Sequence, residues 1–169
     1  MLTKIGTLTE IYTDTEYGTG QKCPRLGAVW HDFAAGKAYI FLMNNGATAI
    51  TAQLLCMALT TDKAAFKCTL AAATASLLPF AGVRVPSATS MAQNEYGWFQ
   101  VIGSATLSAG ASTTTADLGV QSSADTAGKV EVAANTGIGA FGSFGIAQTS
   151  TANGDVVVHL QRNVWGVGL

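Results

Sequence analysis

Charged side chains are scarce in this chain, which limits what it can bind. Lys, Arg, Asp and Glu together make up 11% of its 169 residues, against about 25% in an ordinary soluble domain. The net charge is −1 and the 9 basic residues are scattered, so no basic stripe is present that could neutralise phosphates. We therefore expect no nucleic-acid partner.

Small residues (Ala, Gly, Ser and Thr) occupy many positions where a typical surface carries charges. Such a surface repels neighbouring molecules poorly and favours extended contact between proteins. We therefore interpret the composition as that of a protein that binds other proteins over a broad area. The alternative is a β-rich protein whose side chains are simply small.

Cysteine is scarce, and long hydrophobic runs are interrupted. Cys23, Cys56 and Cys68 show no Cys-x-x-Cys spacing, so we expect reduced thiols with neither a disulfide framework nor a zinc site. The N-terminal residues 1–5 contain no continuous apolar stretch, which argues against a signal peptide. Residues 38–61 carry no charge, but polar residues and a turn interrupt them, so we expect no membrane partner.

Parts of catalytic motifs occur in the sequence, but without the neighbouring residues that these motifs need. Gly137–Gly142 matches the G-x-G-x-x-G fingerprint, but that motif needs a following helix and an acidic residue at the right spacing, and neither is present. Cys23, His31 and Asp32 could form a thiol–imidazole–carboxylate set, although a His beside an Asp at a hairpin edge is typical of a solvated turn. We therefore expect no enzyme, no metal site and no cofactor.

The strongest strand signal lies at residues 94–103, which read Asn-Glu-Tyr-Gly-Trp-Phe-Gln-Val-Ile-Gly. Alternation places Tyr96, Trp98 and Ile102 on one face and Phe99 on the other. Both faces carry large apolar groups, so we expect the central strand of a β-fold, covered on both sides. These four residues are expected in the core or at a subunit interface.

Short apolar segments separated by turn residues fill much of the rest of the chain. Residues 53–59 could form a short helix or a buried strand; we favour a strand, because 60–63 resembles a turn and 66–70 alternates after it. The pattern predicts an all-β fold, a small sandwich or barrel of short antiparallel strands. Further strands are expected at 25–31, 37–43, 80–85, 128–132, 144–148 and 155–161.

The two ends of the chain differ from its middle. Residues 1–25 hold much of the charge, and their apolar residues occur singly. We interpret them as an extended arm that grips a neighbour with Tyr12 and Tyr17; the alternative is an ordinary first strand of the fold. Residues 26–162 form the β-domain. Residues 163–169 are an apolar tail in which we expect Trp165 to contact a partner.

The 94–103 segment resembles one in the head decoration (cement) proteins of tailed bacteriophages, whose usual pattern is Tyr-Gly-Trp-(aromatic or Val)-Gln-Val-x-Gly. Leu26–Val29 before a hairpin and Phe144–Ala147 before the last strand fit the same family. The resemblance implies a non-catalytic virion protein, made in the host cytoplasm, that lies on the outer surface of the capsid. It implies a homotrimer that cements the shell by bridging subunits of the major capsid protein.

An alternative function is that of a receptor- or carbohydrate-binding module, such as part of a head fibre or an adhesin. Aromatic faces stack on sugars, and Trp30, Trp98 and Trp165 could form such a platform. The apolar flanks of Trp98 favour a buried position instead.

Overall fold

The computed structural model describes residues 8–18, 23–58, 60–73, 80–85, 89–110, 115–132, 144–151 and 154–161. In chain order the elements are β1 (Ile11–Tyr12), α1 (Asp14–Gly18), β2 (Val29–Asp32), β3 (Lys37–Asn44), β4 (Leu55–Met57), α2 (Thr60–Ala64), β5 (Lys67–Leu70), β6 (Phe80–Arg84), β7 (Tyr96–Ser108), β8 (Gly119–Ser122), β9 (Val130–Val132), β10 (Gly145–Ala147) and β11 (Asp155–Leu160). The expected all-β fold is confirmed. Helix α2 replaces the turn expected at 60–63. None of the described helices is long and apolar enough to cross a membrane.

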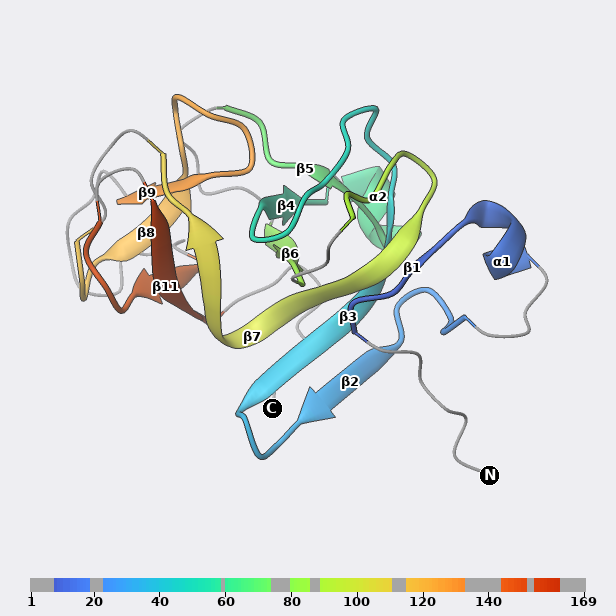
Figure 1. Ribbon diagram of the computed structural model, residues 1–169, viewed down its shortest axis with the longest axis horizontal. Helices are drawn as coiled ribbons and strands as arrows, with labels where there is room; N and C mark the ends of the chain where they lie inside the picture. The colour runs from blue at the N-terminus through green and yellow to red at the C-terminus, as the bar shows by residue number, and fades with distance from the viewer. Residues whose placement is uncertain are drawn as a thin grey trace.

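Strand β7 is the longest element and belongs to two groups of strands (Figure 1). Its first half pairs with β3 and with β6. Strand β6 pairs with β4, β4 with β5, and β5 returns to β3, so these strands close into a barrel. The β3–β5 pair is parallel, which departs from the expected antiparallel pattern.

The second half of β7 leaves the barrel and joins a further group of strands. It pairs with β11, which is followed by β10, β8 and β9. The bend between the halves is at Gly103, whose φ of +86° is a conformation that L side chains rarely adopt. A Cβ at this position would collide with the carbonyl oxygen of Gly36, so the bend also brings β7 against the β2–β3 hairpin.

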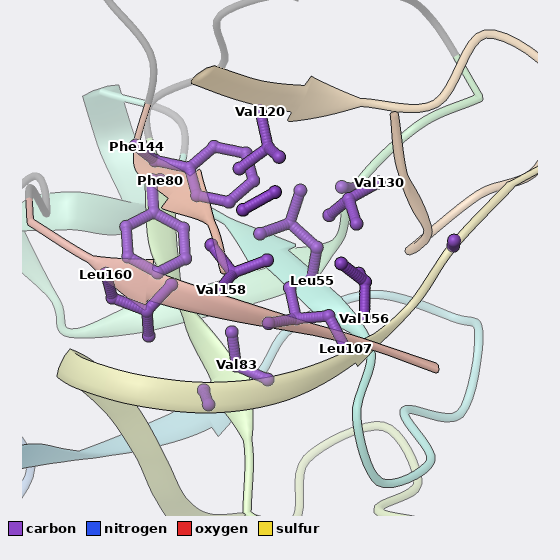
Figure 2. Close-up of a cluster of buried hydrophobic side chains, with 14 residues drawn as sticks. Leu55, Phe80, Val83, Leu107, Val120, Val130, Phe144, Val156, Val158 and Leu160 are labelled. Atoms are coloured by element: carbon purple, nitrogen blue, oxygen red, sulfur yellow. The ribbon is translucent and has the colours of Figure 1, made fainter. Parts of the chain in front are cut away.

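Two apolar clusters fill the inside of this architecture. One occupies the barrel and includes Ile40, Leu42, Phe99 and Val101 from β3 and β7. The other lies between the barrel and the second group of strands (Figure 2). Figure 2 shows side chains from both groups pointing toward one another, including Leu55, Val83, Leu107, Val120, Val130, Val156, Val158 and Leu160. Burial of this apolar area is the main force that joins the two halves.

A third cluster covers the outer face of β3 and β7 and includes Phe41, Tyr96 and Trp98. The expectation that residues 1–25 stay outside the β-core is wrong for Ile11 and Tyr12. Strand β1 pairs with β7, and only 6% of Tyr12 is exposed. The apolar outer face needs a cover, and the chain's own N-terminal segment supplies it. The boundaries at residues 25 and 162 otherwise stay a prediction.

The faces of β7 match the predicted alternation for Tyr96, Trp98 and Phe99. Tyr96 and Trp98 lie in the outer cluster, whereas Phe99 and Val101 lie inside the barrel. Ile102 does not share the face of Trp98 as predicted, because the register with β3 shifts between Ala38 and Tyr39. This bulge turns Ile102 toward the cluster inside the barrel, against which it packs.

Candidate interaction surface

The β2–β3 hairpin projects from the body of the protein (Figure 1). At its tip Phe33 is 77% exposed, and on β2 Val29 is 40% exposed. These are the exposed large hydrophobic side chains among the described residues. An apolar group that remains in water at the end of a hairpin marks a candidate contact with another protein.

The turn that carries Phe33 is held by local interactions. The Asp32 carboxylate oxygen Oδ1 accepts a hydrogen bond from the Ala35 N–H at 3.1 Å, as Asp side chains often do in turns. Gly36 has a φ of +63°, a conformation that glycine adopts readily in such a loop. The Phe33 ring stacks on the His31 ring with centroids 5.4 Å apart and an interplanar angle of 11°. Phe33 is therefore presented in a defined orientation.

Strand β2 is at one end of the strand order and pairs only with β3 among the described strands. An edge strand offers unpaired N–H and C=O groups to another chain. A partner segment could therefore add to β2 by strand addition and contact Val29 or Phe33 at the same time.

The base of the hairpin is fixed to the outer face of the barrel. The Trp30 ring stacks on Tyr39 with centroids 5.3 Å apart. The Gly27 N–H donates to the Phe41 carbonyl oxygen at 2.9 Å, which extends the pairing beyond β2. Trp30 is half-buried and packs against the outer cluster, so the described structure leaves little of it for stacking on a sugar.

The N-terminal segment also contributes aromatic groups to the outer cluster. The Tyr17 ring stacks on Tyr96 at 4.3 Å between centroids, and the Tyr96 hydroxyl donates to Asp14 Oδ1 at 2.8 Å. Helix α1 begins with a reciprocal cap, in which the Thr13 N–H donates to Glu16 Oε2 at 2.8 Å and the Glu16 N–H donates to the Thr13 hydroxyl at 3.3 Å. Burial, the hydrogen bond to Asp14 and its charge raise the pKa of Tyr96 to about 12.

The residues predicted to bind partners fall in different places. Tyr12 is in the outer cluster of its own chain, where its hydroxyl donates to Glu10 Oε2 at 2.5 Å. Tyr17 is half-buried against Tyr96. Trp165 and the tail 163–169 lie outside the described residues. Their roles toward a partner stay predictions.

Phe33 was missed as a candidate, although one signal was available. A Phe in a four-residue loop between two strands has no neighbours with which to form a core. Such a residue is worth treating as a possible contact whenever the loop is short.

The groups considered for catalysis do not form a site in the described part of the chain. Burial and the charge of Glu16 raise the pKa of the Cys23 thiol to about 11, so it is protonated at neutral pH and a poor nucleophile. Among the described residues no group of three or more His, Cys, Asp or Glu side chains could hold a metal ion. Gly137–Gly142 lies outside them.

Comparisons with known solved structures add a likeness in fold. No protein-family model matches the chain, and no curated protein matches it. Among solved structures, the chain is similar to the N base of the head fiber gp8.5 of bacteriophage phi29, with a TM-score of 0.48 and 13% sequence identity. The likeness covers 75% of this chain and 96% of that one. At this TM-score it establishes neither a shared function nor a closely shared fold.

Proposed function

We propose that this chain is a non-catalytic structural protein of a phage head, which lies on the outer capsid surface and binds the major capsid protein through the β2–β3 hairpin. The observation that carries this proposal is the exposed Phe33 at the tip of the β2–β3 hairpin, which has a free strand edge. By binding the assembled shell better than free subunits, the protein stabilises the shell by mass action.

The resemblance of residues 94–103 to cement proteins supports the proposal, because each distinctive residue there has a structural role. Tyr96 and Trp98 form the outer cluster, and Gly97 faces the inside of the barrel. The Gln100 side chain donates to the carbonyl oxygens of Ile102 and Ser104 at 3.1 and 3.0 Å, across the bulge. The pattern therefore specifies how β7 bends from one group of strands to the other.

A homotrimer is part of this proposal, but it needs a different interface from the one first expected. The two apolar faces of β7 are covered within the chain, by the barrel interior and by the N-terminal segment. In this proposal the free edge of β2 pairs the copies of the trimer, which leaves Phe33 at the hairpin tip for the capsid. Light scattering that showed a stable monomer, together with isolated monomers on heads, would exclude the trimer.

Binding to heads tests the hairpin directly. Purified protein is mixed with heads that lack it, the heads are sedimented, and the bound copies are counted. We expect Phe33→Ala to lower the bound amount at least tenfold while the melting temperature stays unchanged, because the side chain is in water in the free protein. His159→Ala is the control, since His159 is exposed on β11, a strand of the other group.

Two results would contradict the proposal. Equal binding of the Phe33→Ala and His159→Ala variants would show that the hairpin tip is not the contact. Binding of glycans by the free protein, with no affinity for heads, would favour the receptor- or carbohydrate-binding alternative.

A further inference from the structure

Strand β2 has one edge with which no described strand pairs. It is one end of the strand order, whereas the other end, β9, forms a bridge with the residue that follows β7. The Phe41 N–H donates to the Ala28 carbonyl oxygen at 2.9 Å. Because successive residues of an antiparallel strand direct their backbone groups to opposite edges, the N–H and C=O groups of Val29 and His31 face away from β3. They are available to an added strand.

Symmetry decides what kind of segment can use this edge in a trimer. If two β2 edges paired with each other, both copies would contribute the same surface, and such a contact closes after two copies. A ring of three needs a contact in which β2 of one copy meets a different segment of the next. That segment has to be able to extend, and it has to carry apolar side chains for the exposed face of β2.

The sequence after Gln161 has the composition of such a segment. Residues 163–169, which lie outside the described residues, read Asn-Val-Trp-Gly-Val-Gly-Leu and carry no charged side chain. Valine and tryptophan are enriched in strands. In an extended conformation, alternation would place Trp165, Val167 and Leu169 on one face and both glycines on the other. The tail therefore combines one apolar face with one nearly bare face.

The chain leaves β11 beside the β2–β3 hairpin. Leu160, the last residue of β11, pairs with Gly103, and a Cβ at Gly103 would collide with the carbonyl oxygen of Gly36 in the hairpin loop. An extended chain spans at most about 3.3–3.6 Å per residue, so residues 162–169 can reach up to about 25–30 Å. Because neighbouring strands lie about 4.8 Å apart, this length is enough to reach β2 of an adjacent copy.

We propose that residues 163–169 of one copy add as a strand to the free edge of β2 in the next copy, so that three copies exchange their tails in a ring. This inference rests on the trimer of the proposed function. The tail backbone bonds to the outward N–H and C=O groups of Val29 and His31. Its apolar face, with Trp165, covers Val29, which is 40% exposed. Phe33 at the hairpin tip stays available to the capsid.

Light scattering of the full chain and of two variants tests the tail. Replacing Trp165→Ser and Val167→Ser together removes the apolar face and keeps the chain length. We expect the measured mass to fall from that of three chains to that of one, while circular dichroism still shows the folded protein. Phe33→Ala is the control, since it changes an exposed side chain that is assigned to the capsid, and it should remain a trimer. A trimer that survives the double substitution would overturn the tail exchange.

Cross-linking shows which chain supplies the added strand. Val29→Cys and Val167→Cys are placed in one chain, together with Cys23→Ser to remove the half-buried native thiol; Cys56 and Cys68 are buried. A short bismaleimide then joins the two introduced thiols. We expect covalent trimers on a denaturing gel, because position 29 of each copy lies beside position 167 of another.

The other outcomes overturn the exchange. A cross-link within one chain would show that the tail covers β2 of its own copy. Dimers formed by the Val29→Cys variant alone would show that two β2 edges pair with each other. A trimer without any cross-link would overturn the tail exchange and leave the trimer of the proposed function intact. A wild-type monomer would exclude that trimer and the tail exchange together.

Discussion

Replacing Trp98 by alanine would empty the largest of the fully buried side-chain positions in the described structure. Trp98 is 1% exposed and lies in the outer cluster, where its ring meets Phe41 edge-on with centroids 5.3 Å apart and an interplanar angle of 67°. The strands on which it packs belong to the barrel wall, so the surroundings can collapse only in part. The loss should therefore appear in the free energy of unfolding.

The size of the effect follows from three contributions. Truncating a buried Trp to Ala typically costs about 3–5 kcal/mol, and an edge-on aromatic pair accounts for about 0.5–1.5 kcal/mol of such a loss. Among the described residues the indole Nε1 of Trp98 has no hydrogen-bond partner, so the substitution removes no hydrogen bond seen there. At about 2–4 °C per kcal/mol for a chain of this length, the melting temperature should fall by roughly 6–20 °C.

Circular dichroism during urea unfolding measures this change without relying on Trp fluorescence. Trp98→Phe is the matched variant: it keeps an aromatic ring and removes an unpaired buried donor, so we expect it to cost less than about 1.5 kcal/mol. Trp30→Ala should cost less than Trp98→Ala, because Trp30 is only half-buried. A Trp98→Ala variant within about 1 kcal/mol of the wild type would refute the placement of Trp98 in the core.

Three further predictions concern the bend, the N-terminal segment and alkaline pH. Gly103→Ala should lower the free energy of unfolding by about 1–3 kcal/mol from backbone strain alone, because φ at Gly103 is +86°. Gly18→Ala is the control and should be tolerated. Urea unfolding compares the two variants, and equal stability would contradict the bend at Gly103. Deleting residues 1–20 should lower the free energy of unfolding by at least about 2 kcal/mol, since the deletion removes the buried Tyr12 and uncovers the outer cluster. An unchanged melting temperature would instead support the interpretation of residues 1–25 as an arm outside the β-core. The pKa of Tyr96 rises from 10.0 to about 12 on folding, so the stability that the neutral Tyr96 hydroxyl contributes is full below pH 10 and is lost as the pH rises toward 12. Melting temperatures measured over a pH series should decline less for Tyr96→Phe than for the wild type. Parallel curves would show that ionisation of Tyr96 is not the cause of the decline.

The sequence was informative where the side chains themselves carried the pattern. Strand β3 was predicted at 37–43 and is observed at Lys37–Asn44. The alternation of Tyr96 and Trp98 against Phe99 was also correct, because large apolar groups on both faces of one strand need cover on both sides.

The incorrect predictions share a physical cause. Each concerns a feature that is set by contacts between segments distant in the sequence. Gly103 resembled the end of a strand, yet it is the bend through which β7 continues to Ser108. Ile102 changed sides because of a bulge set by pairing with β3. Tyr12 is an isolated apolar residue in a polar segment, and only the outer face of β7 explains its burial. No local pattern contains this information.

The continuity of β7 has a consequence for how the protein unfolds. One half of the strand is a wall of the barrel and the other half pairs with β11, so neither group of strands can open without disturbing a backbone that the other requires. Local opening in proteins usually follows units that can separate from the rest, and here the separating boundary would have to pass through a single strand. The amide protons of β7 should therefore exchange with solvent only through global unfolding, and both halves of the molecule should lose protection together. Under a stretching force, this arrangement would leave no weaker half to open first.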